Sequence, residues 1–171
     1  MRRLNLFSLL MAFVMAGAAV SPAFAQGSVQ KELAQVRRAT AKYHSTQAAM
    51  AAGYNFVNGL DYCFNNPGVG GMGYHLINTT LLMDGKVDPL RPEAMVYAPD
   101  QNGDLHLVAV EYIVPITEGS QPPELFGRTF ETNTDLGVYE LHAWIFKSNS
   151  LGMFNDWNPK VSCYPLSDRY Q

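Results

Sequence analysis

The stretch "DLHLVAVEYIVP" (residues 104–115) decides the fold class of this chain. Its β-branched and apolar residues are bounded by turn residues, a pattern typical of a buried β-strand. Similar runs occur at 93–99 ("EAMVYAP") and 137–147 ("GVYELHAWIFK"), and "PDQNGD" (99–104) predicts a hairpin between the first two strands. "YHLIN" (74–78) is a candidate fourth strand.

Residues 28–52 carry a helical pattern instead. Bulky residues recur every three or four positions, which predicts one core-facing stripe that buries Tyr43 and Met50. Ser28 can begin this helix and Gly53 can end it. One helix followed by antiparallel strands indicates an α+β fold, with the helix packed across one face of the sheet. A lipocalin-like barrel is a weaker alternative, because a barrel of that kind has about eight strands and only four are convincing here.

The first 25 residues are typical of a secretory signal peptide. Arg2 and Arg3 precede the apolar run "LFSLLMAFVMAGAAV", and a small-x-small pattern follows at Ala23 and Ala25. We expect cleavage after Ala25, which would leave residues 26–171 as a single globular domain in the periplasm or outside the cell. An uncleaved anchor is the alternative, and after cleavage no other segment is long and apolar enough to span a membrane.

Two cysteines remain in the predicted mature chain. An isolated pair in an exported protein most often forms a disulfide, so we expect Cys63 and Cys163 to be joined. Two thiolates on a metal ion are the alternative, but neither cysteine has a second one nearby in sequence. Long loops rich in Pro, Gly and Asn, at 64–73, 115–127 and 147–160, complete the chain.

Charge and motifs exclude several classes of function. The chain has a formal net charge of −3, and its basic residues cluster nowhere except at 36–38, so a nucleic-acid partner is not expected. No G-x-S-x-G elbow is present, and the glycine-rich "GVGGMG" lacks the Lys-Ser/Thr end of a phosphate loop. The sequence does not indicate an oligomeric state.

Glu111 is the most unusual residue of the strand pattern. A carboxylate within an apolar strand is costly unless a cation, a metal ion or a hydrogen-bond donor pairs with it. By alternation it shares a face with Leu107, Ala109 and Ile113, so that face is expected to be buried. The simple structural explanation is an ion pair with an arginine such as Arg91 or Arg128.

Two histidines lie in comparable surroundings. His75 follows the glycine-rich stretch, and His142 lies mid-strand on a face with Glu140 and Trp144. Together with Glu111 they form the ligand set of a two-His-one-carboxylate site for a divalent transition metal such as zinc. The expected pocket rim consists of Gly70, Gly71, Gly73, Tyr74, Tyr112 and Trp144.

Each of these residues also has a structural interpretation. The histidines could be hydrogen-bonded core residues, and the glycines could form a bulge or tight turn. His106 lies at an odd interval from Glu111, so it joins the same site only if a bulge intervenes. His44 flanks the helical stripe and is expected at the surface.

The segments "GGMGYHLIN", "LVAVEYIVP", "YELHAWIF" and "GMFNDWNPKVSC" resemble a family of uncharacterised exported bacterial single-domain proteins. The likeness covers about Arg38 to Cys163. It implies a secreted single domain but no catalytic residues, since the family has no established activity. Related chains often carry a Gly/Pro/His-rich stretch before the "YELHAW" strand. Residues 131–138 have no histidine here, which implies different ligand binding or none.

Three functions follow from these observations. The first is an exported small-ligand protein that binds a metal ion through His75, Glu111 and His142. The second is a structural or protein-interaction module without a small-molecule site. The third is a metal-dependent hydrolase or lyase that uses the same ion. The first function requires that the three side chains converge on one site, whereas the second does not.

Overall fold

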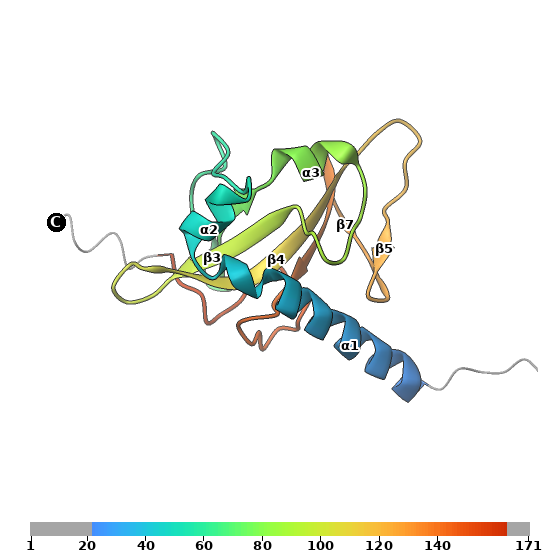
Figure 1. Ribbon diagram of the computed structural model, residues 1–171, viewed down its shortest axis with the longest axis horizontal. Helices are drawn as coiled ribbons and strands as arrows, with labels where there is room; N and C mark the ends of the chain where they lie inside the picture. Colours follow the sequence, from blue (N-terminus) through green and yellow to red (C-terminus); the bar gives the residue numbers. More distant parts are fainter. Residues whose placement is uncertain (1–21, 164–171) are drawn as a thin grey trace, which may run out of the picture.

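Strand β4 (Leu105–Pro115) lies within a six-stranded antiparallel sheet of the computed structural model, which describes residues 22–163 (Figure 1). The sheet order is β1-β2-β3-β4-β8-β7. The other strands of this sheet are β1 (Phe64–Asn66), β2 (Gly70–Ile77), β3 (Ala94–Pro99), β7 (Glu131–Asn133) and β8 (Val138–Ala143). A separate short hairpin is formed by β5 (Glu124–Leu125) and β6 (Arg128–Thr129). The predicted α+β fold is confirmed, and the predicted signal peptide lies outside the described residues except for residues 22–25.

The predicted single helix at 28–52 is wrong in two respects: the helix begins earlier, at Pro22 and not at Ser28, and it is broken. The helical elements are α1 (Pro22–Thr40), a 3-10 turn η1 (Ala41–Tyr43), α2 (Thr46–Ala51) and α3 (Thr79–Asp84). The break occurs where the Ser45 side chain accepts the Ala48 N–H and so caps a new helix. The helices of residues 22–163 are too short or too polar to cross a lipid bilayer.

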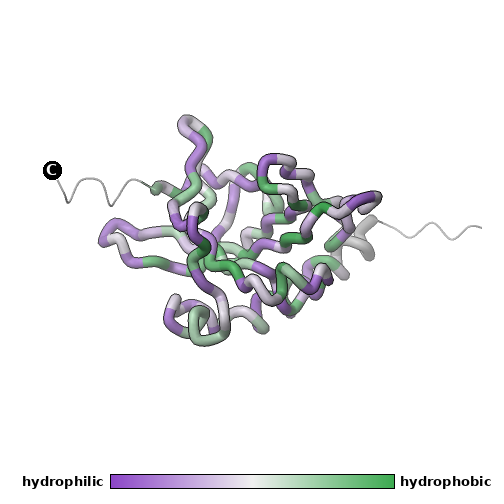
Figure 2. Tube along the Cα trace, turned by 90° about the horizontal axis from the view of Figure 1, so that it is seen from above, coloured by the Kyte–Doolittle hydropathy of each residue, from purple (hydrophilic) through white to green (hydrophobic). Residues whose placement is uncertain are grey.

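The main apolar core lies between α1 and one face of the sheet. Leu33 and Val36 of α1 pack in the same cluster as Tyr97, Val110 and Tyr112 of the central strands. Figure 2 shows the apolar residues gathered near the middle of the molecule, whereas the outlying loops are mostly hydrophilic.

The helical break also changes which side chains α2 buries. The prediction that Met50 is buried is wrong, since its side chain is 38% exposed and Ala49 takes the core position. Tyr43 is half-buried and packs against the core. The core stripe of α1 therefore does not continue through the break.

A β-bulge in β4 changes which residues share the face of Glu111. The register with β3 shifts between Ala109 and Leu107, so Val108 is the extra residue. Leu107 therefore packs in the α1-side core with Val110, and not beside Glu111 as strict alternation predicts. Ala109 and Ile113 keep the expected face.

The predicted disulfide is confirmed. Cys63 and Cys163 are bonded, with their Cα atoms 5.7 Å apart. The bond joins the residue before β1 to the end of the loop at 147–163. That loop also pairs with β2, because Asn158 exchanges backbone hydrogen bonds with Gly71. The loop is thereby fixed against the sheet at both places.

Candidate metal centre

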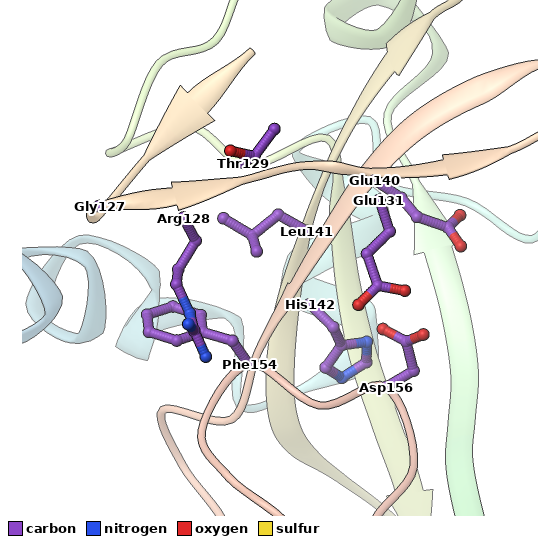
Figure 3. Close-up of a pocket in the computed structure, with 9 residues that line it drawn as sticks. All are labelled: Gly127, Arg128, Thr129, Glu131, Glu140, Leu141, His142, Phe154 and Asp156. Carbon is purple, nitrogen blue, oxygen red and sulfur yellow. The ribbon is translucent and has the colours of Figure 1, made fainter. Parts of the chain in front are cut away.

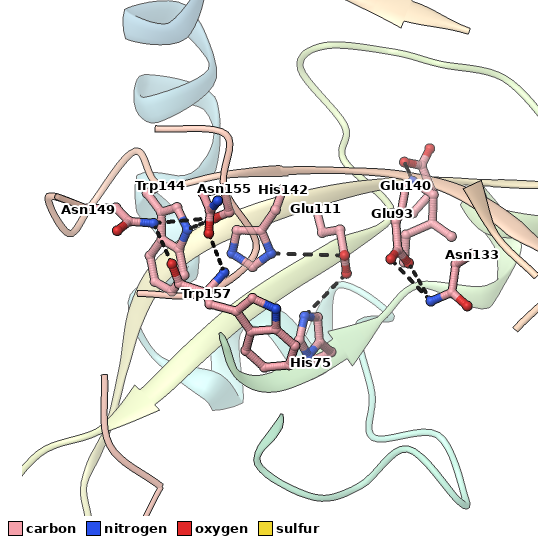
Figure 4. Close-up of polar contacts among 11 residues, drawn as sticks. His75, Glu93, Glu111, Asn133, Glu140, His142, Trp144, Asn149, Asn155 and Trp157 are labelled. Carbon is pink, nitrogen blue, oxygen red and sulfur yellow. Dashed lines mark hydrogen bonds and ion pairs between the residues drawn. The ribbon is translucent and has the colours of Figure 1, made fainter. Parts of the chain in front are cut away.

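Three strands bring His75, Glu111 and His142 together on the sheet face opposite the α1-side core (Figure 4). Glu111 of β4 and His142 of β8 are direct cross-strand partners. His75 of β2 reaches Glu111 across β3, where Ala94 is the cross-strand partner of Glu111. Because alanine has only a methyl group, the long side chains on either side of β3 can meet above it.

The three side chains are close together and almost fully buried. His75 Nε2 lies 3.2 Å from Glu111 Oε2, and His142 Nδ1 lies 3.9 Å from Glu111 Oε1. Their exposed fractions are 5% for His75, 5% for Glu111 and 0% for His142. One ligand atom from each residue lies within 4.8 Å of the others, so this group could hold a metal ion.

The two imidazoles have too few partners within the protein. His75 Nδ1, His142 Nδ1 and His142 Nε2 have no hydrogen-bond partner among the described residues. A buried polar atom without a partner costs about 1 to 3 kcal/mol. The site therefore contains ring nitrogens whose lone pairs or protons are not satisfied by the fold itself.

No arginine neutralises Glu111 within residues 22–163. Arg91 instead pairs with Asp88 at the surface, with Arg91 Nε 2.8 Å from Asp88 Oδ2. The Arg128 guanidinium lies over the Phe154 ring. The simple explanation of Glu111 as half of an arginine ion pair is therefore wrong.

Burial sets the protonation of the three residues. It lowers the pKa of His75 to about 4 and, with the neighbouring His75, lowers the pKa of His142 well below its ordinary value. It also raises the pKa of Glu111 well above its ordinary value, and the negative charges of Glu140 and Asp156 add to this effect. Both imidazoles are therefore neutral near pH 7, the form that ligates a metal ion.

Apolar groups hold the two rings in place. The Trp144 ring lies 4.6 Å from the His142 ring, and the Phe64 ring meets His75 edge-on at 5.1 Å between centroids. Apolar clusters flank the three residues along the strands. One contains Val96, Ala109 and Trp144; the other contains Ile77, Ala94 and Ile113.

The glycines before His75 serve backbone packing and do not line the pocket. A Cβ atom at Gly73 would collide with the Tyr97 carbonyl of β3, and one at Gly70 would collide with the Asn158 carbonyl. Both residues also have positive φ, which favours glycine. At Gly71, a Cβ atom would lie 2.9 Å from a Val161 methyl group. The glycines thus allow β3 and the 147–163 loop to approach β2 closely.

The other predicted rim residues also lie elsewhere. Tyr112 is on the opposite sheet face, where its hydroxyl donates to the Pro89 carbonyl at 2.8 Å. Tyr74 is half-buried and meets the Phe56 ring. Trp144 contacts His142 but is buried, and its indole N–H donates to the Asn155 carbonyl. None of these three residues borders the two cavities that reach the site.

Two cavities reach the three residues from different sides. One, of about 330 Å³, is bordered by His75 and Glu111, and the other, of about 370 Å³, by His142 (Figure 3). Glu140 and Asp156 line both cavities. Burial raises the pKa of Asp156 to about 7, helped by the charges of Glu131 and Glu140.

The sequence interpretation did not assign Glu140 and Asp156 to the site. Glu140 lies two residues before His142 on the same strand face, and this spacing was a usable signal. Asn133 donates to Glu140 at 3.1 Å and so orients it. Asp156 comes from the irregular 147–163 loop, where no periodicity indicates the direction of a side chain.

The two remaining histidines lie outside the site. The bulge moves His106 to the Glu111 side of β4, but its imidazole is exposed and lies 3.2 Å from Asp100 Oδ2. His44 is exposed and packs edge-on against Phe146. Only His75 and His142 are therefore placed to bind the same ion as Glu111.

Comparison with protein-family models, with curated protein sequences and with solved structures found no match to this chain. The resemblance to a family of exported bacterial proteins stays a prediction.

Proposed function

We propose that this protein is an exported metal-binding protein whose His75, Glu111 and His142 side chains hold one divalent transition-metal ion, such as Zn²⁺. The single observation that supports this most strongly is the buried group of ring nitrogens without partners beside an unneutralised carboxyl. Two imidazoles and one carboxylate are a common ligand set for zinc and for non-haem iron.

A bound ion would contact all three residues at once. Ligand atoms about 2.0 to 2.2 Å from zinc lie about 3 to 4 Å from one another. The observed separations of 3.2 and 3.9 Å between Glu111 and the two histidines already fall in this range. The ion would neutralise Glu111 and accept lone pairs from His75 Nε2 and His142 Nδ1, the ring nitrogens that lie nearest to Glu111. It would thereby give a partner to His142 Nδ1, one of the three unpartnered nitrogens.

A purely structural role for the three residues is less favourable. Histidines retained only for packing would be expected to donate and accept hydrogen bonds within the core. Here the carboxyl meets neighbouring acidic residues and no cation. An interaction module without a small-molecule site gives no reason for this arrangement.

The first test measures zinc binding directly. Metal-free protein, purified without its signal peptide, is titrated with Zn²⁺ by calorimetry, and bound metal is counted after dialysis. We expect one zinc ion per chain. Loss of an outer-shell partner costs about 10- to 100-fold in affinity, so we expect the ligand variants Glu111→Gln and His142→Asn to lose at least about 100-fold.

The matched control is His106→Asn, because His106 is an exposed histidine already close to a carboxylate. It should bind zinc as the unmodified protein does, and circular dichroism should show that all variants are folded. Wild-type affinity in Glu111→Gln and His142→Asn would refute the proposed site.

A metal-dependent hydrolase or lyase is the second candidate. Three protein ligands leave a coordination position open for water or substrate, which is typical of catalytic zinc sites. The cavity bordered by His75 and Glu111 supports this candidate, because it gives a small molecule space beside the ion.

A further inference from the structure

The cavity bordered by His75 and Glu111 has a distinctly apolar body. Its volume of about 330 Å³ is near the lower end of the range for ligand pockets, which suits a single ring or a short alkyl chain. Its apolar walls include Leu60, Phe64, Leu82, Ile113, Val138 and Trp157. These residues come from β1, α3, β4, β8 and two loop segments, so parts of the chain far apart in sequence supply the walls.

The charged side chains that line the same cavity are all acidic. Glu111, Glu140 and Asp156 contribute three carboxyls, and no lysine or arginine is among the described residues that line the cavity. Asn133 donates to Glu140, but an amide carries no charge. The charged groups that act on Asp156 are Glu131 and Glu140, which are also acidic.

A second feature points to a ligand at this end. His75 lines the cavity and is 95% buried, since only 5% of it is exposed, and its Nδ1 atom has no partner. A ligand would thus meet apolar walls, a group of carboxylates and the unpartnered His75 Nδ1 within one cavity. With Nε2 bound to the ion, Nδ1 carries the ring hydrogen and is a donor, so the carboxylates are the acceptors that an ammonium group would use.

We propose that this cavity binds a small hydrophobic amine, with its apolar body between Leu82 and Trp157 and its ammonium group at Glu140 and Asp156. This inference rests on the proposed function, because it names the class of small molecule that would lie beside the ion held by His75, Glu111 and His142. Glu111 is then committed to the ion, and two carboxylates remain for one ammonium group.

The charges exclude the opposite class of ligand. With Glu111, Glu140 and Asp156 ionised, three negative charges surround an ion of charge +2, so the site keeps a net charge of −1. A carboxylate or phosphate group would add to this negative charge without a basic residue to pair with it. A neutral alcohol of the same shape would gain the apolar contacts but not the charge-assisted hydrogen bonds. The amine is the one member of such a series that gains both.

Three probes of nearly equal shape test this inference on the zinc-loaded protein. Phenethylamine, phenethyl alcohol and hydrocinnamate share a phenyl ring and a two-carbon spacer, and they differ in the charge of the end group. By calorimetry we expect the amine to bind at least about ten-fold more tightly than the alcohol, the factor that one charge-assisted contact of about 1.4 kcal/mol supplies. Hydrocinnamate should bind most weakly.

Two variants separate the charge from the apolar body. In Asp156→Asn the preference for the amine over the alcohol should fall to about two-fold or less, while binding of the alcohol is retained. Val138→Phe should fill the cavity and weaken all three probes. Glu118→Gln, at an exposed acidic residue outside the cavity, is the matched control and should change none of the affinities.

The outcomes distinguish this inference from the proposed function. Zinc binding with equal or stronger binding of hydrocinnamate, or with no binding of any probe, overturns the amine proposal alone. Absence of zinc binding overturns the proposed function. The same three probes on the metal-free protein then still decide whether the cavity prefers an amine.

Discussion

The two faces of β4 are equally buried, but they differ in how their polar groups are satisfied. On the α1 side, Val110 and Tyr112 belong to the main apolar cluster, and the single hydroxyl there donates to the Pro89 carbonyl. On the other side, Glu111 lies between two smaller apolar clusters and meets two imidazoles that have few partners.

This difference separates stability from function within one strand. Burial of the α1-side residues stabilises the fold, at roughly 25 cal/mol per Å² of apolar surface. The carboxyl and imidazoles on the other face instead cost free energy until an ion or ligand satisfies them. Local departures from good packing are expected mainly at functional sites. The predictions below test whether the two faces behave differently.

The largest expected effect is on the loop that covers the face of Glu111. Replacing both cysteines, as Cys63→Ser/Cys163→Ser, removes a cross-link that spans 100 residues, and we expect a loss of about 4 to 5 kcal/mol in the free energy of unfolding. Urea denaturation measures this loss. The Asn158 amide donates to Gly71 of β2 near the disulfide, and the Val161 amide donates to Asn158, so these two amides should lose hydrogen-exchange protection first.

The unmodified, oxidised protein is the reference for this experiment, and amide protection at Val110 and Tyr112 is the internal control. These two amides lie in the core between α1 and the sheet, so they should exchange only through global unfolding. If the free energy of exchange falls by the same amount at all four amides, the loop opens only when the whole protein unfolds. The loop would then not be an independently opening cover of the candidate site.

The second prediction concerns Glu93, a buried carboxyl outside the candidate site. Its side chain is 1% exposed and accepts the Ile113 N–H at 2.9 Å, and burial raises its pKa to about 7. The folded state therefore holds its proton more tightly than the unfolded state does. The stabilisation is fully present below about pH 4.5 and is lost as the pH rises through 7.

Glu93→Gln should remove this part of the pH dependence. Between pH 4.5 and 8, the difference in unfolding free energy between wild type and the variant should change by about 3 kcal/mol, with the variant favoured at high pH. Glu118→Gln, at an exposed site, should leave the profile of the wild type unchanged. A constant difference across this pH range would show that Glu93 has an ordinary pKa.

Much of the sheet could be predicted because strands that are buried on both faces appear in the sequence as runs of β-branched and apolar residues bounded by turn residues. The predicted strand at 93–99 corresponds to Ala94–Pro99, and that at 104–115 to Leu105–Pro115. The bulge at Val108 could not be predicted, since alternation assumes an unbroken register. The prediction of one helical stripe was wrong for a related reason, since it assumes an unbroken helix. Ser45 starts a new helix, and Met50 of that helix lies outside the core.

The candidate site was predicted in part. His75, Glu111 and His142 could be identified because each is a polar residue on an apolar strand, and such residues need partners wherever the strands place them. Their convergence depended on strand order, which no local pattern encodes. Asp156 and the packing role of Gly73 could not be predicted, because both depend on the path of another segment of the chain.

The smallest expected effect compares two neighbouring residues on opposite faces of β4, each changed by one polar group. Tyr112→Phe removes the hydrogen bond to Pro89 O, so it should destabilise the metal-free protein by about 1 kcal/mol. Glu111→Gln keeps an oxygen that can accept from His75 Nε2 but removes a carboxyl whose pKa is raised by burial. At pH 8 it should stabilise the metal-free protein by about 1 kcal/mol.

Zinc should make the wild type more stable than Glu111→Gln, the reverse of their order without metal. Tyr112→Phe should stay less stable than the wild type with or without zinc. With zinc at about 100 times its dissociation constant, wild type gains about 2.7 kcal/mol, whereas Glu111→Gln should gain little because it lacks a ligand. Thermal unfolding at pH 8, with and without zinc, measures the relative stabilities of the three proteins on the same samples. If Glu111→Gln is destabilised as much as Tyr112→Phe without metal, then Glu111 stabilises the fold by itself. Its place between two apolar clusters would then need no ion to explain it.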